Sequence, residues 1–444
     1  MDAPSTAPLA GAEEPEGRGG SGALVVLLLG STLTVMAGAV LSPVLLLIRA
    51  ELSLSSTAAG LVLTSHALSL ALASPLVGWA IDRYGSRAPL AAGLLVYGGA
   101  GGAGLVVDSY AALIATRIVF GIGAAAVFTG TTVVLLELHR GARRDQVMGW
   151  RTTATSLGGV AWPLLGGALG GLSWQAPFAL YLVGIPLGVA TWLALPPRTD
   201  ETAQSGGAGA AADDGHDAER VGQLLRRRPR IVGLCGLLAT GTVLLYGLLV
   251  LVPLRQAELG VRAPFAVAAL STSMSVAMSV AGLGYAAAVA RVGHAGLLRG
   301  TYLTWTAAFV ALATTDVLGI VVLAQAAFGV GMALALPSLT IVLEDASPQR
   351  LRGRVMALSG TAIFLGQFLS PLLLGPVADA VAVTTGFLAA AVLAGAVLVV
   401  LLATDLTGGR DVASPSGTSR PERVGQGRAR GGPRRAGWRA GARP

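Results

Sequence analysis

The chain has 444 residues, of which 53% are hydrophobic and only 12% are charged, and its mean hydropathy is +0.70. A soluble protein of this length would carry roughly 25% charged residues, so too little polar surface is present to cover a water-soluble body. The net charge of +8 comes from 31 basic residues, all of them arginine, in a lysine-free composition that by itself says little about partners. A single cysteine, Cys235, excludes an intramolecular disulfide framework and any multi-cysteine metal site.

Twelve apolar stretches long enough to cross a bilayer follow one another along the chain. A membrane helix needs about 20 mostly apolar residues, because it rises about 1.5 Å per residue and no water satisfies a broken backbone inside the hydrocarbon. The predicted spans are 23–48, 57–80, 88–107, 109–136, 146–170, 174–195, 231–254, 263–288, 296–315, 318–343, 354–380 and 384–404. The sequence therefore predicts an all-α integral membrane protein.

Arginine is distributed unevenly between the loops that join these spans. Sixteen arginines lie in the loops on one side, against Arg49, Arg255 and Arg262 on the other. Positively charged loops stay in the cytoplasm. The pattern predicts a multi-pass protein of the cell inner (plasma) membrane with both termini in the cytoplasm.

Polar stretches divide the spans into two sets of six. The predicted domains are a disordered cytoplasmic N-terminus (1–22), an N-terminal six-helix bundle (23–195), a cytoplasmic linker (196–229), a C-terminal six-helix bundle (230–404) and a disordered arginine-rich cytoplasmic tail (405–444). The tail could hold anionic lipid at about 1 kcal/mol per arginine near the surface. Genome composition alone is the other explanation for its arginines.

The second half of the chain repeats the first at an offset of 208 residues. Phe120 corresponds to Phe328, Pro163 to Pro371, and Val147–Met148 to Val355–Met356. A parallel repeat of two six-span halves predicts a two-fold axis along the membrane normal, with a central cavity and a rocking motion at the interface.

The loop after the second span carries the strongest local pattern, Gly78-Trp-Ala-Ile-Asp82-Arg83-Tyr-Gly85-Ser-Arg87. Gly78 has no side chain to hold off a neighbouring helix, and Gly85 permits a tight turn. Asp82 is an acceptor for a helix N-terminus or an arginine. A basic turn that only sets the topology is the alternative interpretation.

With these residues the chain resembles the major facilitator superfamily in its bacterial twelve-span form, over about 380 residues. The resemblance implies twelve transmembrane helices arranged as two pseudo-symmetric six-helix bundles. It also implies transport by alternating access, with Asp82, Arg83 and Arg87 in a latch at the cytoplasmic gate and Gly78 and Gly85 as conformational residues beside it. In the repeat the acid and the distal arginine are replaced by alanines (Ala290 and Ala295), so any latch is one-sided.

The fifth span reads Gly158-Gly-Val-Ala-Trp162-Pro163-Leu-Leu-Gly166-Gly167. It resembles the fifth-helix motif of drug/proton antiporters, except that the family usually has glycine where Trp162 stands. Proline frees a carbonyl and glycines allow close packing, so this span, and its repeat around Pro371, can kink and slide. Trp162 either fills a cavity, stacks on a planar ligand or faces lipid, and it puts the motif's close packing in doubt.

Arg117 lies about nine residues into the fourth span, or about 13 Å of helical rise. A charge at this depth costs at least about 2.5–3.5 kcal/mol unless it faces a polar cavity or partner. It resembles the family's fourth-helix arginine, which some members use in proton or substrate coupling; a structural arginine bonded to carbonyls is the alternative. Its repeat mate Gln325 is also polar, which favours a shared polar site.

The first span has no carboxylate, although drug exporters of the family commonly place a coupling acid there. His66 in the second span is the remaining candidate for proton binding, because the pKa of histidine is ordinarily near 6.5; helix packing is the alternative. Candidates for lining the cavity are Tyr246, Trp305, Met332 and Gln367. Aromatic and thioether groups suit amphipathic organic substrates.

No catalytic or metal-binding pattern appears in the sequence. We expect a protein that is not an enzyme, with no cofactor, no metal and no nucleic-acid partner. We expect a monomer that contacts membrane lipid, a small organic substrate, and protons or another coupling ion. The first hypothesis is efflux of a drug-like compound or secondary metabolite in exchange for protons. The alternatives are an uptake permease for a small nutrient or weak organic anion, and a non-transporting membrane sensor or scaffold.

Overall fold

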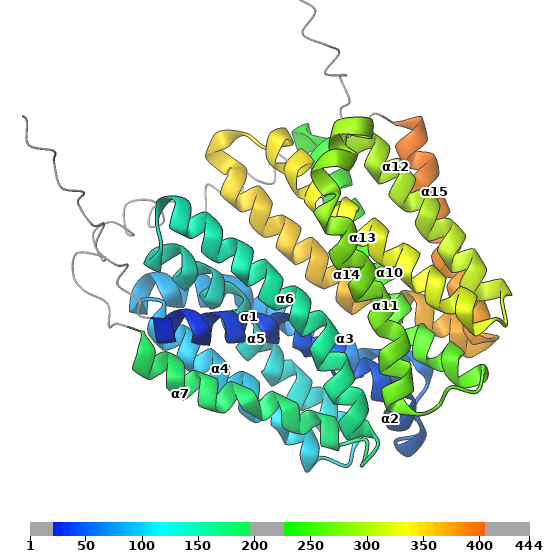
Figure 1. The fold of residues 1–444 in the computed structure, drawn as a ribbon, viewed down its shortest axis with the longest axis horizontal. Coiled ribbons are helices and arrows are strands. Elements are labelled where there is room, and N and C mark those ends of the chain that lie inside the picture. The colour runs from blue at the N-terminus through cyan, green and yellow to red at the C-terminus, as the bar shows by residue number, and fades with distance from the viewer. Residues whose placement is uncertain (1–20, 196–225, 405–444) are drawn as a thin grey trace, which may run out of the picture. The chain divides into compact units, whose positions relative to one another are not determined.

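The computed structural model describes residues 21–195 and 226–404, and every structural statement below concerns these residues. Over both ranges the chain is helical and contains no β-strand (Figure 1). The predicted disordered tail (405–444), nearly all of the N-terminal segment (1–22) and most of the linker (196–229) lie outside the described residues.

Each half of the chain folds into six membrane-length segments. The N-terminal half contains α1 (Ser21–Ala39), η1 (Ser42–Val44), α2 (Leu45–Glu51), α3 (Ser56–Tyr84), α4 (Arg87–Gly102), η2 (Ala103–Leu105), α5 (Tyr110–Leu138), α6 (Gly141–Gly170), η3 (Ala176–Val183) and α7 (Gly184–Ala194). The C-terminal half contains α10 (Pro229–Glu258), α11 (Pro264–Leu283), α12 (Tyr285–Thr314), α13 (Leu318–Ala346), η4 (Gln349–Leu351), α14 (Arg352–Ala380) and α15 (Val383–Ala403). Among the described helices, ten are long and apolar enough to cross a membrane by length and composition alone. The other two membrane-length helices, α6 and α12, are not among these ten. Both carry charged residues in their first half, Arg143, Arg144 and Asp145 in α6 and Arg291 and Arg299 in α12.

The structure differs from the predicted spans at two places. The first span is not one helix from 23 to 48: α1 ends at Ala39, and Pro43 lies in the 3-10 turn before α2, because proline cannot donate the hydrogen bond that would continue an α-helix. The eighth span ends at Leu283 rather than 288. The segment that follows bends at Gly293, whose φ of 66° only glycine adopts readily.

The internal repeat is confirmed at the level of helix ends and packing. α5 and α13 begin and end at positions that are 208 residues apart (Tyr110–Leu138 and Leu318–Ala346). Gly121 of α5 packs directly on the backbone carbonyl of His66, and its mate Gly329 packs on that of Met274. These contacts are again 208 residues apart, so the two halves share one packing scheme.

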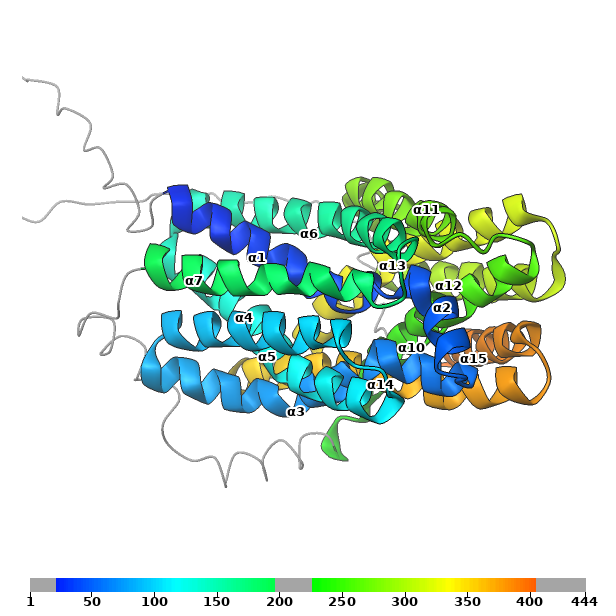
Figure 2. The same ribbon diagram turned by 90° about the horizontal axis from the view of Figure 1, so that it is seen from below.

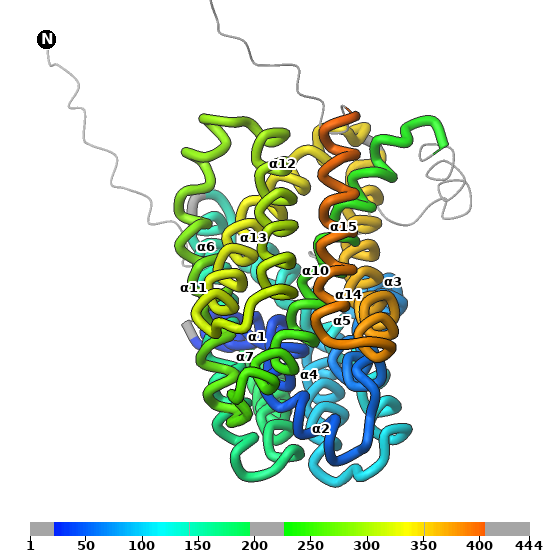
Figure 3. The backbone as a smooth tube through the Cα atoms, turned by 90° about the vertical axis from the view of Figure 1, so that its right-hand side faces the viewer, coloured from blue at the N-terminus to red at the C-terminus, as the bar shows by residue number. Residues whose placement is uncertain are grey.

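Two antiparallel helix pairs join the halves: α3 packs along α14, and α6 packs along α11. Figures 2 and 3 show α3 beside α14 on one side of the bundles, and α6 beside α11 on the other. We call these pairs the α3·α14 seam and the α6·α11 seam. The offset of 208 converts one seam into the other, because α3 corresponds to α11 and α6 to α14.

Both seams are tight at one end. This end carries the loops between α2 and α3, between α10 and α11, and between α14 and α15. We call it arginine-poor, because it belongs to the side that holds only Arg49, Arg255 and Arg262. A Cβ built on Gly60 would lie 2.5 Å from the Cβ of Pro371, and one built on Gly167 would lie 2.7 Å from the carbonyl oxygen of Pro264. The backbones approach closely there because glycine has no side chain.

The seams open toward the other, arginine-rich end. Gly78 lies eighteen residues after Gly60, which is about five helical turns, so both face the same direction. A Cβ on Gly78 would meet no atom within 4 Å among the described residues, and the same holds for Gly149, Gly282 and Gly360. The two halves are therefore in contact at the arginine-poor end and diverge toward the arginine-rich end.

We expect Gly121→Ala to lower the stability of the folded protein by about 1–3 kcal/mol, because the added methyl overlaps the backbone of α3. Gly360→Ala is the matched control, since the same methyl meets open space on α14. Thermal unfolding of the purified protein in detergent measures the difference. Equal melting temperatures for the two variants would contradict the packing described for α3 and α5.

Candidate functional site

Two buried polar side chains from opposite halves meet near the middle of the α3·α14 seam. His66 of α3 is 2% exposed and Gln367 of α14 is 4% exposed. Their Nε2 atoms lie 3.2 Å apart. His66 lies ten residues into α3, about 15 Å along the helix, so this bond joins the halves at about half the depth of a bilayer.

A third polar side chain, Tyr246 of α10, completes this cluster. Its hydroxyl lies near the Gln367 side chain. Its ring packs against Gly38 of α1, where a built Cβ would lie 3.3 Å from Cε1. His66, Tyr246 and Gln367 form what we call the central polar cluster. The sequence singled out each of them, but only the structure brings them together.

The hydrogen bond between His66 and Gln367 depends on which imidazole nitrogen carries the proton. With the Gln367 amide donating, His66 Nε2 accepts the hydrogen bond and the imidazole proton resides on Nδ1, which has no hydrogen-bond partner among the described residues. Protonation of Nε2 would place two donors face to face. The Gln367 amide would then have to turn its oxygen toward the ring or lose the bond, so the imidazole charge is linked to a contact between the halves.

Arg117 of α5 is fully buried in the N-terminal half and is held by aromatic rings. Its guanidinium carbon lies 4.5 Å from the ring centre of Phe120, 5.2 Å from that of Phe178 and 4.8 Å from that of Tyr181. Nη2 donates to the carbonyl of Gly101 at 3.1 Å. In the described part of the chain, Nε and Nη1 have no hydrogen-bond partner. The charge is thus stabilised mainly by ring faces.

Phe120 connects Arg117 to the central polar cluster. The His66 ring meets Phe120 edge-on, with ring centres 5.5 Å apart, and the Arg117 guanidinium lies over the same Phe120 ring. Gln325, the repeat mate of Arg117, is fully buried in the other half and donates to the carbonyl of Val321 in its own helix at 3.4 Å. The contacts of Arg117 and Gln325 therefore lie within separate halves.

Two of the cavity candidates lie in the packed interior of the C-terminal half. Trp305 is 1% exposed, stacks on Phe328 with ring centres 4.7 Å apart, and donates from Nε1 to the Phe328 carbonyl at 3.0 Å. Met332 is 9% exposed in the same interior. Neither side chain reaches the central polar cluster through a contact described here.

The fifth-helix motif retains close packing in spite of its tryptophan. Trp162 of α6 is half-buried and donates to the carbonyl of Thr32 in α1 at 3.2 Å. One turn to either side, Gly158 packs on the Thr32 side chain and Gly166 on the backbone of Val40, directly after the end of α1. The indole thus lies along α1 without separating the two helices. Pro163 is adjacent inside α6, and Gly167 contacts α11 across the seam.

The loop motif is arranged around the end of α3. Gly85 ends the helix with a φ of 79°, and Asp82 and Arg83 are exposed in its last turn. Arg87 stacks on the Trp192 ring at 4.4 Å, and its Nε donates to the Trp192 carbonyl at 2.9 Å. Arg87 therefore joins the start of α4 to the end of α7 within the N-terminal half.

Sequence comparison of the repeats missed a second arginine clamp. Ala295 occupies the position that corresponds to Arg87, but Arg299, four residues later, donates from Nε to the Leu401 carbonyl at 3.0 Å. It joins α12 to the end of α15 as Arg87 joins α4 to α7. The sequence did contain a sign of this contact, because Arg299 lies one helical turn after the position that corresponds to Arg87.

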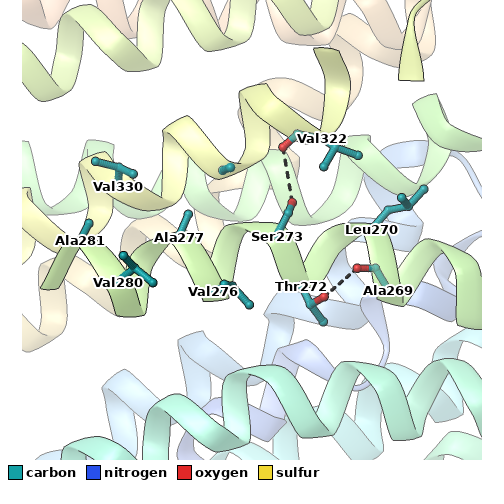
Figure 4. A pocket seen from close by; sticks show the side chains of 11 residues that line it. Ala269, Leu270, Thr272, Ser273, Val276, Ala277, Val280, Ala281, Val322 and Val330 are labelled. Atoms are coloured by element: carbon teal, nitrogen blue, oxygen red, sulfur yellow. Dashed lines mark hydrogen bonds between the residues drawn. The ribbon is translucent and has the colours of Figure 1, made fainter. Parts of the chain in front are cut away.

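An open groove of about 670 Å³ lies between α11 and α13 (Figure 4). It is lined by α11 from Ala269 to Ala281 and by three residues of α13, Val322, Ala326 and Val330. Its two hydroxyl groups are used by the backbone: Thr272 donates to the Ala269 carbonyl and Ser273 to that of Val322. The groove therefore presents an apolar surface.

A model of the Major Facilitator Superfamily matches residues 27–286 and 258–440. Relatives include a hexuronate transporter of Bacillus subtilis (strain 168), 28% identical over 31% of this chain, and multidrug resistance protein 1 of the same organism, 29% identical over 40%. The chain spans only 32% and 46% of the length of these two relatives. The quinolone resistance protein NorA of Staphylococcus aureus is 24% identical over 34% of this chain and 38% of its own length.

Solved structures resemble the fold over most of its length. A mutant of the nucleoside transporter NupG matches with a TM-score of 0.74 at 12% identity, over 86% of this chain and 99% of its own. An inward-open structure of the xylose transporter XylE from E. coli matches with a TM-score of 0.65 at 14% identity, over 85% and 94%. At these identities the likeness concerns the fold.

We expect Arg117→Met to fold and to melt no lower than the parent protein. Methionine fills similar volume against the rings, and the variant no longer buries a charge that lacks a carboxylate partner. Arg255→Met is the control, because Arg255 forms ion pairs with Glu258 and Asp316, and its loss should cost about 1–3 kcal/mol. Thermal unfolding in detergent compares the two. A large drop for Arg117→Met would show that this arginine is needed for stability.

Proposed function

Because the chain belongs to the Major Facilitator Superfamily, whose members are membrane transporters and not enzymes, we propose that it exports small drug-like organic molecules in exchange for protons by alternating access. The observation that carries this proposal is the bond between His66 and Gln367, a titratable contact between the halves at mid-depth. It lies between a closed end and an open end of the seams. A carrier needs both a gate that alternates and a group whose charge state changes with it.

The proposed orientation places the arginine-rich end in the cytoplasm. In that orientation the tight contacts of Gly60 and Gly167 lie on the external side, and Gly78 and Gly360 face the cytoplasmic opening. The state described here is then inward-facing and ready to accept a substrate from the cell. We propose that six-helix bundles over 23–195 and 230–404 rock about the two seams.

The cytoplasmic gate is proposed to form from the loop motif. Asp82, Arg83 and Gly85 lie at the end of α3, next to the opening between the halves. Gly78 leaves room for α14 to approach when this end closes. Arg87 contributes indirectly, because it fixes the start of α4 on α7. Pro163 and Pro371 lie inside the two seam helices that must flex during this motion.

The chemistry of the central polar cluster supports a weakly polar substrate. It offers an imidazole, a phenol and an amide, which bind neutral or amphipathic molecules, and no lysine or carboxylate. Multidrug resistance protein 1 and NorA, both named for resistance to drugs, are among the relatives. Uptake of a weak organic anion is the second candidate. It is favoured by two guanidinium nitrogens of Arg117 that have no hydrogen-bond partner within 21–195 and 226–404, although that charge lies behind aromatic rings.

The proposal predicts that cells lacking the protein retain more of a toxic amphipathic compound than cells that contain it. Fluorescent and radiolabelled solutes measured in both strains, with and without a pH gradient, give the comparison. The uptake alternative predicts the opposite: mutant cells would accumulate less of a nutrient. Proteoliposomes that accumulate no solute under any imposed gradient would exclude transport and leave the sensor or scaffold hypothesis.

We expect His66→Asn to reduce the stimulation of transport by a pH gradient about tenfold or more. Asparagine keeps a polar group beside Gln367 but does not titrate, so exchange of substrate without a gradient should persist. His139→Asn is the control, because this buried histidine bonds to the Leu135 carbonyl within its own half. If both variants respond to the gradient like the parent protein, His66 is not the coupling group.

A further inference from the structure

A carboxylate at the arginine-poor end of α14 caps the first turn of α3 in the other half. Asp379 Oδ1 accepts from the Ser56 amide at 2.6 Å, and Oδ2 accepts from the Thr57 amide at 3.0 Å. The Thr57 hydroxyl donates to the same Oδ2 at 2.8 Å. One side chain of the C-terminal half thus makes three hydrogen bonds to the N-terminal half, in the region where the seam is tight.

These bonds complete the hydrogen bonding of a helix start. The first amide groups of an α-helix have no partner within the helix. In α3 the Ser55 hydroxyl accepts from the Ala58 amide at 3.1 Å, so the intrahelical cap satisfies only one of the early donors. The two amides before it are satisfied by Asp379 across the seam. When this end opens, both must find water instead.

The position of Asp379 is unfavourable within its own helix. It is the next-to-last residue of α14, where a negative charge meets the negative end of the helix dipole. The N-terminus of α3 provides the opposite partial charge. The carboxylate is therefore best stabilised when the two halves are docked, and the docking itself is permitted by Gly375, one turn earlier. A Cβ there would lie 2.5 Å from the Thr57 hydroxyl oxygen.

The second seam lacks this device. At the offset of 208, Asp379 corresponds to Gly171 and Ser56 to Pro264. Glycine has no acceptor side chain, and proline at the start of α11 has no amide hydrogen to donate. The α6·α11 seam is tight at the same end but relies on packing of small residues, with Gly167 against the backbone of α11. The polar lock is thus present in only one of two otherwise equivalent seams.

We propose that Asp379 is a positioning residue of the external gate, a one-sided lock whose carboxylate cap on α3 holds the arginine-poor end closed and sets the balance between the two access states. This inference rests on the alternating access proposed above. The gate forms when the cap forms and opens when the amides of Ser56 and Thr57 exchange the carboxylate for water. His66 and Gln367, at the proposed coupling site, lie deeper in the seam and are not among the hydrogen-bond partners of Asp379.

The test measures distances between the halves in the full-length protein in lipid nanodiscs. In a Cys235→Ser background, spin labels at Glu51→Cys and Val381→Cys report on the arginine-poor end, and labels at Asp145→Cys and Leu283→Cys report on the arginine-rich end. All four labelled positions are exposed. Pulsed electron paramagnetic resonance then gives the populations of open and closed molecules at each end without any need for a known substrate.

Asp379→Asn is expected to shift the ratio of open to closed molecules at the arginine-poor end about fivefold toward open. Thr57→Val removes only the hydroxyl bond and should shift it in the same direction by a smaller factor. If Asp379→Asn does not fold, Thr57→Val alone tests whether the cap controls the gate. Asp316→Asn is the matched control, because it removes a carboxylate from the same end whose ion pair with Arg255 lies within one half.

Two outcomes separate the lock from the transport proposal. If Asp379→Asn and Thr57→Val both give the same distance distributions as Asp316→Asn, the cap does not control the gate and the inference is overturned. If the arginine-poor end opens but the arginine-rich end does not close in response, the lock is supported and the reciprocal gating of the proposed function fails.

Discussion

The close approach of helix backbones at the two seams is the constraint on which the rest of the structure depends. Inside a bilayer, helices gain little from excluding lipid, so association relies on van der Waals contact and on the few hydrogen bonds that can form. Gly60 on Pro371 and Gly167 on Pro264 supply that contact at one end of the molecule. Because the closest backbone approach is at one end, the other end is left open, and the buried polar side chains lie between the two.

The two seams share a plan but differ in chemistry. In the α6·α11 seam, small residues contact backbone, and the Ser275 hydroxyl donates to the Gly159 carbonyl at 3.1 Å. In the α3·α14 seam, side chains from both halves bond to each other, His66 with Gln367 at mid-depth and Thr57 with Asp379 at the arginine-poor end. Contacts between small residues tolerate sliding, whereas directional hydrogen bonds form or break. The α6·α11 seam is therefore held mainly by packing of small residues, which allows sliding. The α3·α14 seam is held by side-chain hydrogen bonds, which are either formed or broken.

Much of this architecture could be predicted from the sequence, because hydropathy, arginine asymmetry and a constant offset are properties of the whole chain. The twelve membrane-length segments and the equivalence of α5 with α13 follow from them. The pairing of His66 with Gln367 could not be predicted, because their repeat mates are Met274 and Gly159 and no symmetric pair exists to suggest it. Arg299 was missed because a strict offset does not detect a clamp that has moved by one helical turn.

The spacing of Gly60 and Gly78 has a consequence for the surrounding bilayer. The two glycines lie about five turns apart on one face of α3, so the contact with α14 can pass from one end to the other without any rotation of α3 about its own axis. The side chains that touch lipid then keep the same neighbours while the helix tilts. In the proposed rocking motion, the lipid around α3 would therefore have to follow only a change in the tilt of the helix.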